Sequence, residues 1–595
     1  GRRNVRYGSW ILRCVLLLVP VCGLAAAGHE KGSISAADAA FVRLADEFID
    51  TYFLPNDPAN ATTVGVHAYD GKLQDFSRAG IDREVATLEA FEKRFAAIDP
   101  ATLDGQTRGD RDLVLGTIRS RLLTRQTIRT WAKDPNLYSS AITNSAFVIM
   151  ERKFAPVPDR LRALIAREKL MPAVLETARR NLKNPPEIYT EIALEQIGDL
   201  AAFFQKDVPA AFADVSDADL RKQFEAANSA VIKALNEYGL WLKSDLLPSS
   251  KGDYRLGEET YRKKLLYDEM VDTPLDKLIE IDLADLKRNQ DEFARVAKSL
   301  EPDKTPLEVL ADLSADYPEP SKLLDSFRAT FDGLIKFIND KHIISIPSQV
   351  RPTLEETPPF MRATTFASMD TPGPLETVAN EAYFNVTLPE ASWPKERVTE
   401  FMAQFSYPVI SNVAVHEAYP GHYIQFLWMH DVHDRVRKLF GATTNIEGWA
   451  HYCEQMMLDE GLAQSVFPND ERQQKLLKLG QLQDALLRNA RFYVGIKLHT
   501  GAITFDQAVD FFVKEGYQSH AVGVVETKRG AGDPTYLYYT LGKIEILKLR
   551  ADVQTRQGSA FKLQQFHDDF MRQGAAPIPI VRRALLPDAA ATASH

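Results

Sequence analysis

The stretch that decides how this chain folds around its site reads Val415-His416-Glu417-Ala418-Tyr419-Pro420-Gly421-His422-Tyr423-Ile424-Gln425. It places two histidines and a glutamate within seven residues. Two neutral imidazoles and one carboxylate form a ligand set that binds Zn²⁺ and leaves a fourth position for water. A further carboxylate beside that water can accept its proton. The pattern therefore predicts that His416 and His422 bind zinc and that Glu417 is the general base.

The two histidines are spaced more widely than in the common His-Glu-x-x-His helix, whose ligands lie at i and i+4. Here Pro420 occupies i+4 and the second histidine lies at i+6. Six residues turn a straight helix by about 600°, so the two rings would point roughly 120° apart. Pro420 cannot donate a backbone hydrogen bond to His416, and Gly421 tolerates unusual dihedral angles. We therefore expect a bulge or kink that brings His422 beside His416.

A second acidic segment reads Ile446-Glu447-Gly448-Trp449-Ala450-His451-Tyr452-Cys453-Glu454. Glu447 and Glu454 lie seven residues apart, so a helix places both on nearly one face. By spacing alone, either glutamate can be the third zinc ligand. The other would accept a hydrogen bond from a ligating histidine or form a salt bridge. His451 lies one turn from Glu447 and is expected to be a second supporting residue.

The segment from His416 to His422, followed by Glu447-Gly448-Trp449-Ala450, resembles the bacterial family known as domain of unknown function 885. That family is similar to the helical zinc peptidases of the thimet oligopeptidase and thermostable carboxypeptidase type. The resemblance covers most of the chain, with its motifs between about residues 355 and 550. It implies a mainly α-helical, zincin-like architecture with a small β-sheet near the active site. It also matches Glu447 to the third ligand, which makes Glu454 the supporting residue.

Tyrosines cluster in a later segment, Asp533-Pro534-Thr535-Tyr536-Leu537-Tyr538-Tyr539-Thr540. The resemblance implies that Tyr539 donates a hydrogen bond to the oxyanion that forms when water attacks a carbonyl. Tyr536 and Tyr538 are the alternates for this role, and Tyr536 is otherwise expected to contact the substrate. Upstream, Arg529 can bind a substrate carboxylate through two parallel hydrogen bonds. The alternative is that any one of these tyrosines is an ordinary core residue.

The composition is that of an ordinary globular protein: 595 residues, of which 45% are hydrophobic and 26% charged. The formal net charge of -10 argues against a nucleic-acid partner, because such a partner requires a basic surface. The three cysteines are Cys14, Cys22 and Cys453. Two of them fall in the first 28 residues, so we expect no internal disulfide in the mature chain.

Residues 1–28 combine arginines, a short apolar run and several small residues, the pattern of a secretory signal peptide. The apolar run is too short to span a bilayer comfortably. Cys22 is a candidate lipid-attachment site, but Pro20 and Val21 before it fit such a site poorly. We therefore expect cleavage near Ala27 and an exported protein, periplasmic or extracellular, with an uncleaved anchor as the alternative. No later stretch is long and apolar enough to cross a membrane.

Residues 29–345 are predicted to form a helical N-terminal region, because apolar residues recur at three- and four-residue spacing. Helices are expected over residues 37–52, 83–98, 110–132, 158–182, 186–206, 220–246 and 275–300. Residues 346–595 are predicted to be the metal-binding catalytic region and to form one continuous fold with the first. The isolated histidines His67, His430 and His433 are expected to be structural or solvated.

The segment from Glu381 to Leu388 is typical of a β-strand, and it shortly precedes the metal motif. The edge of such a strand can pair with an extended substrate backbone. Asn385 within it is therefore predicted to contact the substrate. The alternative is a strand that only completes a small structural sheet. A further amphipathic helix is expected from Leu479 to Leu498.

Together these patterns predict an exported zinc hydrolase with one Zn²⁺ per chain, most simply a peptidase that acts on short or unfolded peptides. One alternative is a secreted binding protein whose metal site is structural or inactive, since a structural zinc site is closed by four protein ligands. Another is a zinc hydrolase of non-peptide amides or esters. Mn²⁺ or Co²⁺ could occupy the same ligands.

Overall fold

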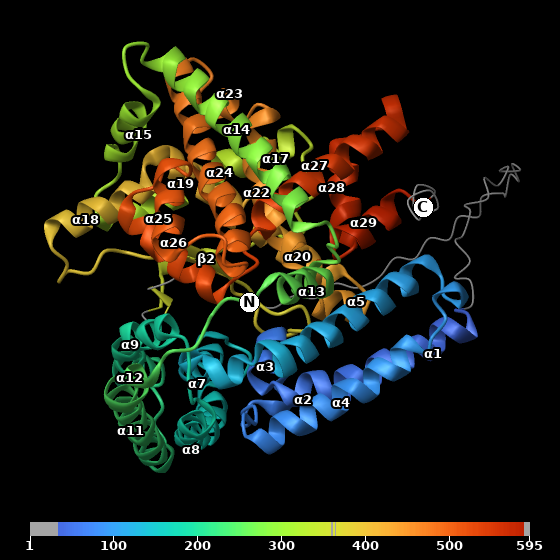
Figure 1. Ribbon diagram of the computed structural model, residues 1–595, viewed down its shortest axis with the longest axis vertical. Helices are drawn as coiled ribbons and strands as arrows, with labels where there is room; N and C mark the ends of the chain where they lie inside the picture. Colours follow the sequence, from blue (N-terminus) through green and yellow to red (C-terminus); the bar gives the residue numbers. More distant parts are fainter. Residues whose placement is uncertain (1–33, 359–360, 363–364, 588–595) are drawn as a thin grey trace, which may run out of the picture.

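The computed structural model describes residues 34–358, 361–362 and 365–587. The predicted signal peptide, residues 1–28, lies outside the described residues. The described chain is mainly α-helical, with one small three-stranded sheet (Figure 1). The predicted fold class is thus confirmed at the level of a mainly helical protein with a small sheet.

Three long helices run side by side near the N-terminus: α1 (Ala36–Phe48), α4 (Arg78–Ala96) and α5 (Gly105–Leu122) (Figure 1, blue). A side chain before each helix accepts a hydrogen bond from its first turn, which satisfies a backbone donor that the helix leaves unpaired. These caps are Ser35, Ser77 and Asp104. The shorter elements among them are η1 (Ile49–Phe53), α2 (Leu54–Asn56), α3 (Pro58–Val64), η2 (His67–Tyr69) and η3 (Pro100–Thr102).

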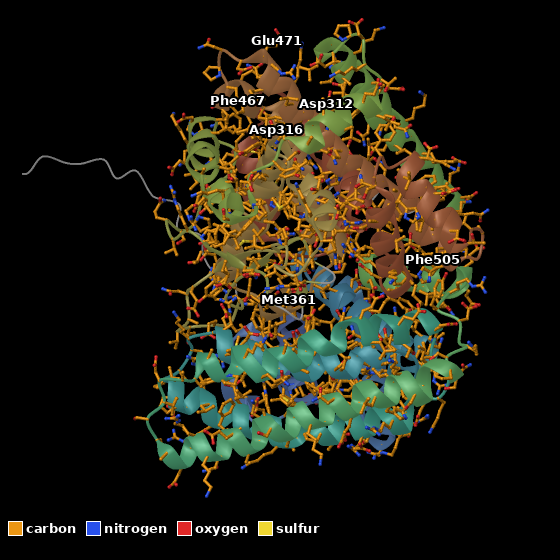
Figure 2. All side chains as sticks on the ribbon, turned by 90° about the vertical axis from the view of Figure 1, so that its left-hand side faces the viewer. Asp312, Asp316, Met361, Phe467, Glu471 and Phe505 are labelled. Carbon is orange, nitrogen blue, oxygen red and sulfur yellow. The ribbon has the colours of Figure 1, made fainter. Side chains whose placement is uncertain are left out.

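A second group of helices packs around its own hydrophobic cluster: α7 (Pro135–Glu151), α8 (Val157–Asn181), α9 (Glu187–Ala202) and α11 (Ala218–Trp241). Figure 2 shows these helices as a layer beneath the rest of the molecule, with Met361 at the boundary. Shorter elements complete this part: η4 (Leu123–Ile128), α6 (Thr130–Lys133), η5 (Phe203–Asp207), α10 (Val208–Ala211), η6 (Leu242–Leu246) and α12 (Leu247–Ser249).

The helix expected over 110–132 is interrupted, whereas the other predicted helices are found with small shifts of their ends. Arg129 adopts a left-handed conformation, with φ of 57°. Its backbone N–H donates to the carbonyl of Thr124 at 2.7 Å, and the indole of Trp131 donates to the carbonyl of Arg125. These bonds satisfy carbonyls at the end of the helix and close it. The apolar spacing continues through the break, so periodicity alone could not reveal it.

The remaining helices form the largest body of the fold (Figure 1, green to red). Helix α24 (Glu471–His499) runs through it for 29 residues and contacts α14 (Leu275–Leu300), α19 (Tyr407–Glu417), α22 (Thr443–Asp459) and α26 (His520–Gly532). It begins eight residues before the predicted start at Leu479, at a cap formed by Asp470. Its central position makes it the support for the other helices.

The other helices of this body are α13 (Glu258–Glu269), α15 (Pro306–Ala315), η7 (Pro320–Lys322), α16 (Leu323–Arg328), α17 (Phe331–Asp340), α18 (Lys395–Met402), η9 (Ala403–Phe405), α20 (His422–Asp431), α21 (Arg435–Leu439), α23 (Leu462–Val466), α25 (Phe505–Lys514), α27 (Tyr538–Gln557), η10 (Gly558–Ala560), α28 (Leu563–Arg572) and α29 (Ile578–Leu585). One hydrophobic cluster joins this body to the first helices, since the rings of Phe48 and Phe53 both contact Phe440. Residues before and after position 345 thus share a core.

The sheet has the strand order β1-β3-β2, formed by β1 (Thr353–Glu356), β2 (Ala367–Asp370) and β3 (Tyr383–Val386). β3 lies within the predicted strand, pairs in parallel with β1 and pairs antiparallel with β2. Because β3 is the central strand, both of its edges are occupied. The idea that its edge receives a substrate backbone is therefore wrong, and β2 is the outer strand that lies beside α19.

Among the described residues, no helix is long and apolar enough to cross a membrane.

Acid should destabilise the fold in part through His567, a buried residue of α28. Its Nδ1 contacts the carbonyl of Ile343 at 2.7 Å and its Nε2 contacts the hydroxyl of Tyr452 at 2.8 Å. Burial lowers the pKa of His567 from 6.5 to about 3. The folded state therefore binds fewer protons than the unfolded state between these values. We expect this residue alone to reduce the free energy of unfolding by about 2 kcal/mol between pH 7 and pH 5.

Urea unfolding of wild type and His567→Gln at pH 7 and pH 5 measures this contribution. The variant should lose less stability on acidification than wild type, whatever its stability at pH 7. His520→Gln, at an exposed position, is the matched control and should follow wild type. Equal losses in wild type and His567→Gln would contradict the assignment.

Candidate metal centre

The predicted kink is a complete break between two helices. Helix α19 ends at Glu417 and α20 begins at His422, and the Tyr419–Pro420 peptide bond between them is cis. Gly421 donates its N–H to the carbonyl of Val415 at 3.0 Å. A Cβ atom at Gly421 would lie 1.8 Å from the carbonyl oxygen of His416. Only glycine therefore allows the chain to turn this tightly.

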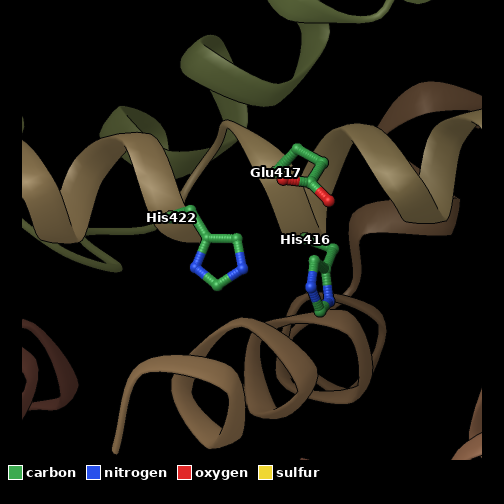
Figure 3. A group of neighbouring side chains, drawn as sticks. All are labelled: His416, Glu417 and His422. Carbon is green, nitrogen blue, oxygen red and sulfur yellow. The ribbon is translucent and has the colours of Figure 1, made fainter. Parts of the chain in front are cut away.

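The break brings the two histidines together (Figure 3). Their ring centroids lie 4.8 Å apart and the rings are perpendicular. Ligand atoms of His416, Glu417 and His422 all lie within 4.8 Å of one another. All three side chains are buried. The expectation that His422 swings back beside His416 therefore agrees with the structure.

Glu447 of α22 completes the cluster. Its Oε2 atom lies 3.3 Å from Nε2 of His416 and 3.2 Å from Nε2 of His422. Two ligand atoms each about 2.1 Å from one tetrahedral zinc ion lie about 3.4 Å apart, so these distances fit three ligands of a single ion. Oε2 is buried and no donor satisfies it with hydrogen-bond geometry. A buried carboxylate oxygen without a partner is costly, and a cation would supply one.

The residues next to Glu447 explain why the sequence holds it there. A Cβ at Gly448 would lie 2.6 Å from the Cα of Gly542, so the two glycines let α22 and α27 cross closely. The indole of Trp449 donates to the carbonyl of Pro420 at 3.0 Å, which ties α22 to the break between the histidines. Each of the three residues Glu447-Gly448-Trp449 thus has a separate geometric role.

Glu454, the other candidate ligand, lies on the far side of His416. Its Oε1 atom is 2.6 Å from Nδ1 of His416. Burial would raise the pKa of Glu454, but Arg488 and His451 hold it well below its usual range. The carboxylate therefore accepts from Nδ1–H, which leaves the Nε2 lone pair of His416 directed at the cluster. The structure thus separates the two glutamates that sequence spacing could not distinguish.

The charges at the centre favour a cation. Burial alone would lower the pKa of His416, but its contacts with Glu447 and Glu454 raise it to about 9. Burial would likewise raise the pKa of Glu447, but His422 and His416 lower it well below its usual value. The carboxylates thus stabilise positive charge between the imidazoles, as a bound divalent ion would provide.

Glu417 differs from the two other glutamates, because neither an ion pair nor a hydrogen bond joins its carboxylate to another described residue, whereas Glu447 and Glu454 both contact histidines. Burial raises its pKa, while His422 and His416 oppose this shift. A carboxylate beside the two histidines that has no ion pair or hydrogen bond of its own is placed to exchange a proton with a water at the centre.

Tyr539, at the start of α27, lies beside the cluster, with its ring 6.3 Å from that of His416. Its hydroxyl accepts a hydrogen bond from Arg529 Nη2 at 2.9 Å, so its own proton is free to donate. Burial raises the pKa of Tyr539, which keeps the hydroxyl protonated. Arg529 also approaches Asp533 and Tyr538, each at 3.4 Å.

The centre opens into a cavity of about 600 Å³, here named the catalytic cavity. Its walls come from α9, β2, α19, α20, α22, α24 and α26, with Tyr539 at the start of α27. Lys528 and Glu195, both in its lining, form a 2.6 Å ion pair between α26 and α9. This volume is typical of small-ligand sites.

Two predicted substrate contacts are not brought into this cavity. Tyr536 is fully buried and donates to the carbonyl of Glu526 at 3.2 Å. Asn385, on β3, is 1% exposed and lines a second cavity, whose walls also include residues of β2. His451 lies as expected beside Glu454, with Nδ1 3.2 Å from Oε2. His67 has a structural place, since its two nitrogens contact Asp70 and Glu376.

Sequence reasoning missed the polar residues of α24 that face the centre. Arg488 lies 3.5 Å from Glu454, and Asp484 accepts from Asn412, which also donates to Glu454. Arg491 and Glu526 form a bidentate pair at 2.7 and 2.8 Å. The charges at 484, 488 and 491 share one helical face, and their position among apolar residues was the signal that could have found them.

Fold and site together define a mainly helical protein with a buried His₂Glu cluster that faces a cavity. Residues 58–585 match the family described as "Bacterial protein of unknown function (DUF885)", so the chain belongs to this family, as its motifs predicted. No curated protein matches the sequence.

Two solved structures are similar over nearly the whole chain. One is "a putative lipoprotein of unknown function from Shewanella oneidensis", with 26% identity, a TM-score of 0.74, and coverage of 92% of this chain and 99% of that one. The other, "the putative lipoprotein from Colwellia psychrerythraea", has 16% identity, a TM-score of 0.75, and coverage of 92% and 98%. At 16% identity, the similarity to the second structure shows that the two chains share a fold.

The helix break can be tested by adding one methyl group. Gly421→Ala places a Cβ against the carbonyl of His416, so α19 and α20 cannot keep their positions. We expect a loss of at least about 3 kcal/mol in the free energy of unfolding. Gly198→Ala is the matched control, because its Cβ would meet no described atom within 4 Å at an exposed position of helix α9. That control should be stabilised slightly. Unchanged stability in Gly421→Ala, measured by urea unfolding, would refute the role of the break.

Proposed function

We propose that this protein is a zinc-dependent hydrolase that cleaves peptide bonds. The observation that carries the proposal is the position of Glu447 Oε2, 3.3 and 3.2 Å from the Nε2 atoms of two histidines. His416, His422 and Glu447 would hold the ion. When bound, zinc supplies Lewis acidity, which lowers the pKa of a bound water and polarises a substrate carbonyl.

Glu417 has the position and the raised pKa of a general base. It would take a proton from the attacking water and return it to the leaving amine. Tyr539 would donate its hydroxyl proton as a hydrogen bond to the developing oxyanion, with Arg529 fixing the orientation of the hydroxyl. Arg488, Arg491 and Arg529 place positive charge around the Tyr539 ring, within 5.4, 4.9 and 5.7 Å of its centroid. That charge would further stabilise an anion.

The peptide assignment rests on two supports. The first is the likeness of the family motif to the thimet oligopeptidase type of zinc peptidase. The second is strand β2, whose residues Ser368 and Met369 line the catalytic cavity. β2 is one of the two outer strands of the sheet and the one that lines this cavity, so an extended backbone can add to it through main-chain hydrogen bonds. Esters and non-peptide amides would not use this edge.

A structural metal site is the second candidate, because Glu417 belongs to the same cluster as the two histidines. If Glu417 were a fourth ligand, the site would be closed and would leave no position for water. The adjoining cavity of about 600 Å³ favours the open, catalytic arrangement.

We further propose that the protein acts outside the cytoplasm. The signal-peptide pattern of residues 1–28 and the description of both similar structures as lipoproteins support this placement.

Metal analysis separates the catalytic from the structural assignment. Wild type and Glu417→Gln should each hold about one zinc per chain by mass spectrometry, while only wild type cleaves a mixed peptide library. Glu447→Gln should bind zinc at least about 100-fold more weakly, because it removes a ligand. Loss of zinc from Glu417→Gln would instead indicate a closed site, and absence of zinc from wild type after loading would overturn the proposal.

Tyr539→Phe tests the oxyanion donor. Removal of one such donor typically lowers kcat by about 10²- to 10³-fold, with little change in KM. Zinc content should stay at the wild-type level. Tyr536→Phe is the matched control, since its hydroxyl bonds a core carbonyl and should leave kcat largely intact. If Tyr539→Phe turns over like wild type, the donor has been assigned wrongly.

A further inference from the structure

A second cavity, of about 640 Å³, adjoins the catalytic cavity along β2. Ser368 and Met369 line both cavities, so the two meet at this strand. The second cavity, here named the acidic chamber, is otherwise walled mainly by α3, α7 and loops near the sheet. A chain lying along β2 from the metal centre would therefore extend into it.

Carboxylates outnumber cations in the described lining of the acidic chamber. The acids are Asp57, Asp134, Glu151 and Asp370, and the cation is Arg152. The charge of Arg152 is already paired, because its two terminal nitrogens donate to Asp370 and to the carbonyl of Glu381. Asp57 and Asp134 cap helices α3 and α7. Asp370 is therefore paired with Arg152, and the chamber keeps an excess of carboxyl groups around Glu151.

Glu151 has an acidic neighbour where a basic one would be expected. It is within hydrogen-bonding reach of Glu355 on β1, and neither residue has a salt bridge among the described residues. Burial, and then the charge of Glu151, raises the pKa of Glu355 to about 8. Arg152 is a nearby cation for both residues but is already paired with Asp370, so the two adjacent carboxyl groups are a receptive place for a further cation.

Asn385 provides an independent sign of a ligand. Its side chain lines the acidic chamber and is 1% exposed, yet its Oδ1 atom has no hydrogen-bond partner in the part of the chain that the structure describes. Buried amide oxygens are nearly always paired, because an unpaired one costs about 1–3 kcal/mol. The hydroxyl oxygen of Ser368, on the shared strand, also lacks a partner. Both oxygens can accept hydrogen bonds from an ammonium or guanidinium group.

We propose that the acidic chamber binds a cationic group of the peptide substrate, while the scissile bond lies at the metal centre and the backbone pairs with β2. The cation is either a lysine or arginine side chain or the free amino terminus. This inference rests on the proposed peptidase function and adds its substrate class. Asn385, which does not line the catalytic cavity, would contact the substrate in the acidic chamber instead.

The test compares peptides of matched length that carry lysine or glutamine at one position, each with a free or an acetylated amino terminus. Binding is measured by fluorescence anisotropy with zinc-loaded Glu417→Gln, and cleavage with wild type. We expect lysine at one position, or the free amine, to tighten binding about tenfold. Persistence of the effect after acetylation identifies a side chain, and its loss identifies the amino terminus.

Two variants assign the preference to the chamber. Asn144 is exposed, lines the chamber and has no hydrogen bond to lose, so Asn144→Lys adds a competing positive charge without disturbing the core. It should reduce the preference to less than about twofold, whereas the control Asn144→Ala should keep it. Glu151→Gln should weaken the preference in the same direction, and folding of each variant is verified by its melting temperature.

The outcomes separate the two proposals. Peptides that are cleaved with no preference for a cation, or a preference that survives Asn144→Lys, overturn the acidic chamber and leave the peptidase function standing. Peptides that zinc-loaded protein neither binds nor cleaves overturn the peptidase function, and the chamber proposal falls with it.

Discussion

Helix α19 stops at Glu417 because the backbone of Gly421 lies against the carbonyl of His416, where no side chain could fit. The whole candidate centre depends on this contact. A continuous helix would turn His416 and His422 roughly 120° apart, whereas the break places their rings 4.8 Å apart. Trp449 holds the break in place from α22, the helix that also carries Glu447. The contact at Gly421 thus sets the positions of the two candidate histidine ligands, and Trp449 ties the helix of the third to them.

The three glutamates of the centre have different tasks because their surroundings differ. Glu447 lies between the two imidazole Nε2 atoms, and Glu454 fixes the tautomer of His416 from behind. Glu417 has no hydrogen-bond partner in the described chain and has a raised pKa. Arg488 compensates the charge of Glu454. The charge of Glu454, behind His416, is thus balanced by Arg488, whereas the charge of Glu417, at the face of the centre, is not balanced by an ion pair. Metal-assisted hydrolysis needs both a supported ligand and a carboxylate that can accept a proton.

The two cavities lie where the separate layers of the fold meet. Helix α9 of the second helical group supplies one wall of the catalytic cavity, and α7 supplies part of the acidic chamber. The outer strand β2 lies between them. Under the proposed function, this arrangement would give the N-terminal half of the chain a direct part in substrate selection, in addition to its hydrophobic contacts with the residues after position 345.

The sequence by itself determined the helical class, most helix positions, the family and which two histidines meet at the candidate centre. It could do so because helix periodicity and a short motif are local properties. It also indicated that Pro420 and Gly421 interrupt a helix. Spacing alone left Glu447 and Glu454 equivalent, because residues seven apart share a helical face. The family resemblance favoured Glu447, and the tertiary structure shows the contacts that distinguish the two. Packing likewise placed Tyr539 in the cavity and Tyr536 in the core, and made β2 the outer strand. These outcomes depend on distances between segments far apart in the chain, which no local pattern encodes.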